Sequence, residues 1–151
     1  MNTTYIIGID PGQSGAAALL APDGRLVNVV KFNGATPHDI GLALEEYGSF
    51  GDNVKAYMEA VHSMPKQGVA SSFKFGKSAG MLEGMLIALK IPYTMVTPAK
   101  WQGAVGCRSK GDKNVTKAAA QRLYPHEKII HANADAILIA AYGRKLETMN
   151  G

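Results

Sequence analysis

The chain has 151 residues, of which 46% are hydrophobic and 19% charged, and this predicts one soluble globular domain over residues 1–151. No apolar run approaches the roughly 20 residues that a membrane-spanning helix needs, and no basic segment precedes the short apolar stretch at the N-terminus, so we expect neither a membrane protein nor a signal peptide. The single cysteine, Cys107, cannot form an internal disulfide, which favours a reducing, cytoplasmic location.

The charge is distributed unevenly along the chain. Residues 1–63 carry 3 basic and 7 acidic side chains (net −4), whereas residues 64–151 carry 13 basic and 5 acidic ones (net +8), which together give the net charge of +4. An enzyme for neutral metabolites does not need such a split, whereas nucleic-acid phosphates favour clustered Lys and Arg. A solvated basic face explains the charge alone equally well.

The first part of the chain predicts three strands joined by short turns, an antiparallel meander. The apolar, β-branched residues 5–9 form the first strand, and residues 16–21 and 26–32 form the next two. The first turn carries Asp10 directly after the strand, followed by Pro-Gly. A helix follows from the N-cap Thr36 to about residue 47.

The second part alternates strands and helices. We expect a strand over 55–59, a polar loop over 60–68, a long helix over 71–90, a strand over 93–96, a short helix near Trp101, a basic loop over 103–111, a helix over 112–124 and a last helix over 133–145. This order predicts an α/β fold with a mixed five-stranded sheet and helices on both faces. The small residues in the middle of the long helix indicate either burial or a subunit contact: Ser78, Ala79, Gly80 and Gly84.

Three carboxylates stand at positions typical of a metal site. Asp10 and Glu59 each end a predicted strand, and Asp135 lies among apolar residues near the start of the last helix. His131 shares a helix face with Asp135 if the helix begins by His131. A buried carboxylate needs a partner, and Mg²⁺ or Mn²⁺ prefers such oxygen ligands. Alone, each residue has a simpler explanation: a turn Asp, a helix-capping Asp or a surface histidine.

Several segments resemble one family. Ile-Gly-Ile-Asp-Pro-Gly-x-Ser-Gly at residues 7–15 with its preceding strand, Met-Glu-Ala-Val-His-Ser-Met-Pro at residues 58–65, and Ala-Asp-Ala-Ile-Leu-Ile-Ala at residues 134–140 resemble the RuvC family of Holliday-junction resolvases. The resemblance is strongest to the small RuvC-like crossover-junction endodeoxyribonucleases of bacteriophages. Gln-Gly-Val-Ala-Ser-Ser-Phe at residues 67–73 and Val-Thr-Pro-x-x-Trp at residues 96–101 also fit that group. The similarity extends over nearly the whole chain.

The resemblance implies an RNase H-like fold, a homodimer, and Mg²⁺-dependent paired nicking of four-way DNA junctions, with Mn²⁺ able to substitute. It also implies that Asp10, Glu59 and Asp135 are metal ligands and that His131 fills the fourth position of the site. The spacing of four between His131 and Asp135 departs from the three of many cellular members. Lys113 corresponds to a basic residue at the rim of the family's cleft.

Cellular relatives place an aromatic wedge shortly after the second acidic residue. In this chain His62 stands at that place, and Phe73 and Phe75 are nearby candidates, although buried core roles are also expected for these phenylalanines and for Trp101.

The sequence therefore predicts a Mg²⁺-dependent endodeoxyribonuclease for branched DNA. A kinase-like ATPase fold would need a second domain, and a non-catalytic DNA-binding module would gain nothing from carboxylates beside phosphates. An RNase H-like nuclease for another branched or hybrid substrate stays open. Basic residues expected to flank the acidic cleft and bind DNA are Lys66, Lys74, Lys77, Lys100, Arg108, Lys110, Lys113 and Lys117.

Overall fold

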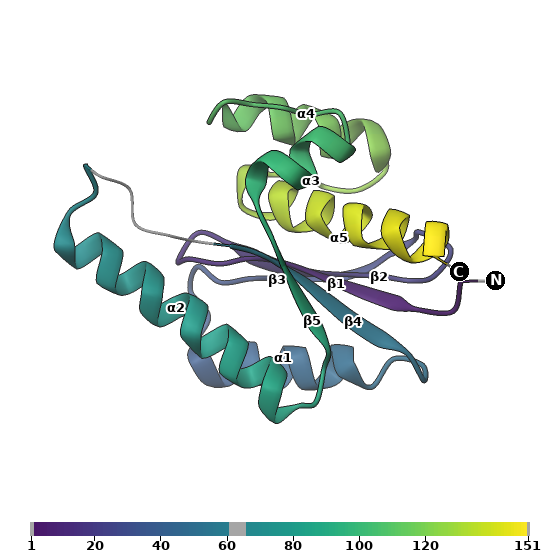
Figure 1. Ribbon diagram of the computed structural model, residues 1–151, viewed down its shortest axis with the longest axis horizontal. Helices are drawn as coiled ribbons and strands as arrows, with labels where there is room; N and C mark the ends of the chain where they lie inside the picture. Colours follow the sequence, from purple (N-terminus) through teal and green to yellow (C-terminus); the bar gives the residue numbers. More distant parts are fainter. Residues whose placement is uncertain (1, 61–65, 151) are drawn as a thin grey trace.

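The computed structural model describes residues 2–60 and 66–150, and its centre is one mixed five-stranded sheet (Figure 1). The strand order is β3-β2-β1-β4-β5. The strands are β1 (Tyr5–Asp10), β2 (Ala16–Leu20), β3 (Leu26–Lys31), β4 (Val54–Glu59) and β5 (Tyr93–Val96). The first three strands are antiparallel, as the meander predicted, whereas β1, β4 and β5 run parallel.

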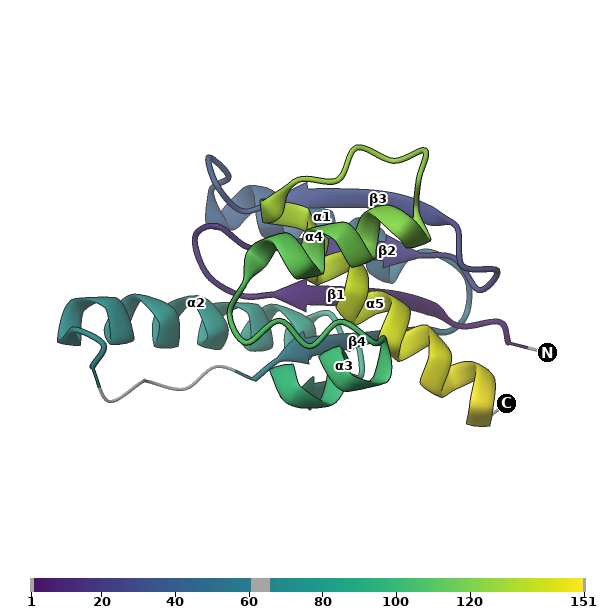
Figure 2. The same cartoon turned by 90° about the horizontal axis from the view of Figure 1, so that it is seen from above.

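Helices cover both faces of the sheet, which confirms the predicted α/β architecture. One face carries α3 (Pro98–Ala104), α4 (Lys113–Leu123) and α5 (His131–Asn150), and the other carries α1 (Pro37–Gly48) and α2 (Val69–Ala88) (Figures 1 and 2). Successive side chains of a strand point to opposite faces of the sheet, so the core has two parts. Ile6 packs toward α5, whereas its neighbour Ile7 packs toward α1 and α2. No helix in the described ranges is long and apolar enough to cross a bilayer.

The boundaries of α2 and α5 differ from the predictions at both ends, and one difference matters for the site. α2 begins two residues early at Val69, and α5 runs to Asn150 instead of about residue 145. α5 also begins at His131, not at Asn133. The Asn133 side chain turns back to accept a hydrogen bond from the Ile130 N–H at 2.9 Å. Asn133 is therefore not the residue before the helix but its third residue. From inside the first turn its side chain satisfies the backbone N–H of Ile130, which precedes the helix.

The small residues of α2 were predicted to be buried or to make a subunit contact, and burial holds for only part of them. Ala79 is buried, and the Ser78 hydroxyl accepts a hydrogen bond from the Gly12 N–H at 3.2 Å, which ties α2 to the β1–β2 turn. Within the described ranges Gly80 and Gly84 face open space, because a Cβ added at either would meet no atom beyond the helix's own backbone within 4 Å. The helix thus leaves an uncovered side.

Candidate active site

The first two acidic residues lie side by side because their strands are parallel neighbours. β1 pairs with β4 in register, with Ile9 opposite Met58, so Asp10 and Glu59 follow at the same edge of the sheet. Asp10 continues the alternation of Ile6, which faces α5, and Glu59 follows that of Tyr57 on the same face. Both carboxylates therefore point toward α5, and it is the parallel pairing that brings them into one site.

The third acidic residue comes from α5, which lies unusually close to β1. A Cβ at Gly8 would lie 2.2 Å from the Ala136 carbonyl oxygen and 2.4 Å from the Ala140 N, so only glycine permits this approach. Asp135 stands one residue before Ala136 and is 4% exposed. It is the fifth residue of the helix, which excludes the simple capping role. The helix thus carries a buried carboxylate to the two strand ends.

Asp135 has a cationic partner from the chain itself. The Lys113 Nζ lies 2.7 Å from Asp135 Oδ2, and Lys113 is the first residue of α4, after the N-cap Asp112. The lysine side chain is 60% exposed, whereas the aspartate side chain is 5% exposed. The second oxygen, Oδ1, is buried and has no hydrogen-bond partner in the described part of the chain. A buried carboxylate oxygen without a partner leaves room for another cation or donor.

Glu59 is held from the opposite side. The Trp101 indole Nε1–H donates to Glu59 Oε2 at 2.7 Å, and Trp101 is fully buried. The core role expected for this residue is therefore correct, but it is not the whole role.

The three carboxylates repel one another in a poorly solvated place. Burial raises the pKa of Asp10 to about 8, helped by the charges of Asp135 and Glu59 and opposed by Lys113. Burial also raises the pKa of Glu59, against the lowering effect of the Trp101 hydrogen bond. Burial alone would lower the pKa of Lys113, but its bond to Asp135 and the nearby acids outweigh this and raise it. Lys113 is therefore charged, and one cation faces three acids.

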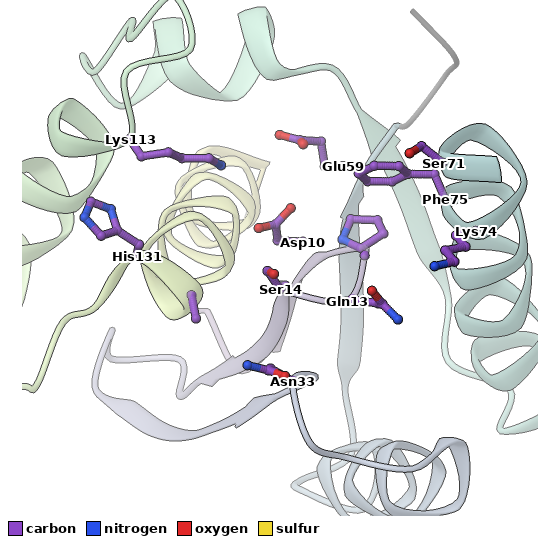
Figure 3. Close-up of a pocket in the computed structure, with 14 residues that line it drawn as sticks. Asp10, Gln13, Ser14, Asn33, Glu59, Ser71, Lys74, Phe75, Lys113 and His131 are labelled. Atoms are coloured by element: carbon purple, nitrogen blue, oxygen red, sulfur yellow. The ribbon is translucent and has the colours of Figure 1, made fainter. Parts of the chain in front are cut away.

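Two open hollows meet at these residues. The larger, of about 710 Å³, contains Asp10 and Glu59 and extends along the β1–β2 turn to the first turns of α2, where Lys74 and Phe75 line it (Figure 3). The smaller, of about 450 Å³, contains Asp135 and extends toward the loop before α4, with Arg108 and Lys110. Glu59 and Lys113 line both hollows. An extended polar ligand can reach the acids from either side.

The structure places the other predicted site residues at different distances from the acids. His131 lies on the rim of the larger hollow, exposed, and its ring is turned away from Asp10 in Figure 3. The basic residues Lys74, Arg108, Lys110 and Lys113 line a hollow, whereas Lys66, Lys77, Lys100 and Lys117 line neither. The wedge position His62 lies outside the described residues.

Several lining residues were not predicted as site residues, although Ser14 and Ser71 stand in the motifs that resemble the RuvC family. Gln13 and Ser14 of the first turn, Asn33 after β3, and Ser71 of α2 face the larger hollow. The glycines of the first turn signalled close approach, but nothing in the sequence placed α2 or the segment after β3 beside it. Phe73 and Phe75 are 71% and 42% exposed, which corrects the expected core role for both.

The acids suit a divalent cation by chemistry, although their side chains stand apart. In the described ranges no three His, Cys, Asp or Glu side chains are grouped closely enough to hold one ion. The donors are nevertheless carboxylate oxygens, the type that Mg²⁺ and Mn²⁺ prefer, and one of them, Asp135 Oδ1, is buried with no partner among the described residues. Three ionised carboxylates against Lys113 would leave two negative charges uncompensated, and a divalent cation would balance them.

Comparison by sequence gives no match: no protein-family model and no curated protein sequence is significantly similar to the chain. Comparison of folds does find similar proteins. The Thermus thermophilus RuvC structure has a TM-score of 0.69 at 19% identity, covering 97% of this chain and 96% of that one. A structure of T. thermophilus RuvC in complex with a Holliday junction substrate gives 0.67 at 18% identity, covering 96% of each chain.

A third solved structure, the yeast mitochondrial Holliday junction resolvase Ydc2, gives a TM-score of 0.50 at 15% identity, covering 97% of this chain and 82% of that one. The chain therefore has the RuvC-like, RNase H-like fold that the motifs predicted. The narrower resemblance to the phage-encoded group rests on the sequence motifs alone.

Proposed function

We propose that this protein is a Mg²⁺-dependent endodeoxyribonuclease that resolves four-way DNA junctions by paired nicking. The observation that carries the proposal is that Asp10, Glu59 and Asp135 line two adjoining open hollows, in a fold shared with a RuvC solved in complex with a Holliday junction. A binding module would not place buried carboxylates where DNA phosphates must lie, because the two repel each other.

Asp10, Glu59 and Asp135 would hold Mg²⁺, and Mn²⁺ is expected to substitute. When bound, the ion supplies Lewis acidity at the scissile phosphate and balances the acids. Asp10 and Glu59 extend from the ends of two paired strands, which would fix the direction of their oxygens. Lys113, which lines both hollows, would neutralise part of the negative charge of the acids. His131, exposed on the rim of the larger hollow, would contact the substrate or an ion from the edge.

The basic residues divide into two groups around the acids. Lys74 flanks the larger hollow, and Arg108 and Lys110 flank the smaller one. A DNA strand that crosses the acids would meet cations on both sides, which offsets the repulsion between carboxylates and phosphates. The four predicted residues that line neither hollow, Lys66, Lys77, Lys100 and Lys117, would contact more distant parts of the arms.

A homodimer fits the same proposal, because a junction has two strands to nick and two-fold symmetry supplies two sites. The uncovered side of α2 is the candidate contact. Gly76, Gly80 and Gly84 repeat every four residues along it and face open space, and Phe73 and Ile87 are 71% and 65% exposed. Glycines at this spacing allow a second helix to approach closely.

The deciding experiment is cleavage of a synthetic four-way junction beside a linear duplex, a three-way junction and an RNA–DNA hybrid, each with Mg²⁺ and with EDTA. We expect Mg²⁺-dependent nicks at symmetric positions in two opposite strands of the junction alone. Preferred cleavage of the hybrid or of the three-way junction would favour the alternative of another RNase H-like nuclease. Junction binding without cleavage at any Mg²⁺ or Mn²⁺ concentration would favour a non-catalytic module.

A further inference from the structure

The buried tryptophan is joined directly to one of the acids. Trp101 is 0% exposed, yet its Nε1–H reaches Glu59 Oε2 at 2.7 Å, and Glu59 lines both hollows. Among the described residues, no hydrogen bond to the other oxygen, Oε1, accompanies it. The core therefore holds one oxygen of this carboxylate, and no described residue holds the other.

The fold fixes the position of the indole as firmly as that of the carboxylate. β5 pairs with β4 so that Val96 lies opposite Glu59, and the Ala60 N–H donates to the Val96 carbonyl at 2.7 Å. α3 begins two residues later behind the N-cap Thr97, whose hydroxyl accepts from the Lys100 N–H. Trp101 thus follows directly from the strand beside Glu59, and its ring packs in the core on the α5 side of the sheet.

We infer that Trp101 is a positioning residue: its indole N–H holds the Glu59 carboxylate in one orientation, in which the other oxygen, Oε1, would bind the cation. This inference rests on the proposed function, since it assigns Trp101 a role in that same site. A simpler explanation is that a buried indole N–H needs some acceptor and Glu59 happens to supply it. The two explanations differ in what the removal of one hydrogen-bond donor does to cation binding.

The chain allows a clean test because Trp101 is its single tryptophan. Replacement of all tryptophan by benzothienylalanine keeps the bicyclic shape but removes the N–H, and replacement by 5-fluorotryptophan keeps the N–H as the matched control. Mn²⁺ affinity is measured by calorimetry without DNA, and kcat and KM are measured on a four-way junction. Loss of the N–H should weaken Mn²⁺ binding by about 10- to 100-fold, as for other groups that orient a metal ligand. It should lower kcat with little change in KM, whereas the fluorinated protein should behave as the natural one.

Unchanged Mn²⁺ affinity and kcat in the benzothienyl protein, with only lower stability, would overturn the inference. If that protein does not fold, ¹⁹F NMR of the 5-fluorotryptophan protein decides. Mg²⁺ should shift its resonance, and the shift should vanish in Glu59→Gln; an equal shift in both, or none in either, would overturn the inference. If the natural protein binds Mn²⁺ but does not cleave junctions, the proposed function fails, while a loss of Mn²⁺ affinity without the N–H would still support the role of Trp101.

Discussion

Lys113 Nζ lies 2.7 Å from Asp135 Oδ2, so the ammonium group of α4 is the counter-ion of the buried acid of α5. The Asp135 side chain is 5% exposed and its second oxygen has no partner in the described ranges, so the site is only partly neutralised by the protein's own cation. An added divalent cation and the Lys113 ammonium would therefore compete electrostatically for the same carboxylates.

Lys113→Met should bind Mn²⁺ more tightly than the natural protein, because a positive charge beside the acids is removed. Without metal the variant should be less stable by about 1–2 kcal/mol, less than for a fully buried pair because Lys113 is well exposed. Calorimetric titration with Mn²⁺ and urea unfolding in EDTA measure the two effects. Lys117→Met, one turn further along α4 and outside both hollows, is the control. Weaker Mn²⁺ binding by Lys113→Met would show that the lysine supports the cation site instead of competing with it.

Asp10→Asn, Glu59→Gln and Asp135→Asn should each lower junction cleavage by more than about 100-fold, because each removes a proposed metal ligand. Junction binding in Ca²⁺ or EDTA should stay within a few-fold of normal, since affinity comes mostly from Lys and Arg contacts with phosphate. His131→Ala, on the exposed rim, should be milder. Gel-shift and nicking assays on one labelled junction separate binding from cleavage. A variant that cleaves at near the natural rate removes its residue from the site.

The raised pKa of Asp10 predicts how stability depends on pH in EDTA. The carboxyl titrates near its ordinary value of 3.8 in the unfolded chain and at about 8 in the folded one, so the folded state binds the extra proton between these values. Stability should therefore fall as pH rises from about 4 to about 8, with a contribution of at most about 1.4 kcal/mol per pH unit from this group. Urea unfolding at several pH values measures the slope.

The matched comparison is Asp10→Asn, whose side chain cannot titrate. Its free energy of unfolding should depend less on pH, and at pH 8 it should be more stable than the natural protein. Saturating Mg²⁺ should also flatten the curve of the natural protein, because a bound cation favours the ionised acid. Parallel curves for the natural protein and Asp10→Asn in EDTA would contradict the burial and repulsion inferred for Asp10.

Lys74→Ala and Lys110→Ala should each weaken junction binding and reduce the slope of log affinity against log salt by about 0.9, the value for one phosphate contact. These residues flank the larger and the smaller hollow respectively. Because the contacts are to the backbone, the loss should not depend on arm sequence. Arg25→Ala, in the turn at the opposite end of the sheet, should leave the slope unchanged. Equal slopes for all three variants would show that the basic residues of 64–151 form an ordinary solvated surface and not a DNA-binding one.

Gly80→Arg should convert a dimer into a monomer, since a large charged side chain on the uncovered side of α2 prevents close helix approach. Sedimentation at micromolar concentration should give about 32 kDa for the natural protein, twice the chain mass of 16.0 kDa, and about 16 kDa for the variant. Leu42→Arg, at an exposed position of α1, is the control. A natural protein that sediments as a monomer would remove the dimer from the proposal.

Much of this protein follows from its sequence. Apolar runs located all five strands, most clearly residues 16–20, because that strand is buried on both faces and apolar throughout. Thr36 and Thr97 marked two helix starts by local hydrogen bonds that need no tertiary contact. The acids Asp10 and Glu59 were visible because each stands at the end of a predicted strand.

Contacts between distant segments decided the rest. The parallel pairing of β1 with β4 set Asp10 beside Glu59, and Gly8 let α5 bring Asp135 to them. The partners Lys113 and Trp101 lie 22 and 42 residues from the acids they bind, so no local pattern could pair them. The sequence alone determined which groups carry the chemistry, because residue type and local periodicity are local properties. Tertiary structure decided which groups touch, how deeply they are buried and therefore how they titrate, because burial and charge interaction depend on the whole packed chain.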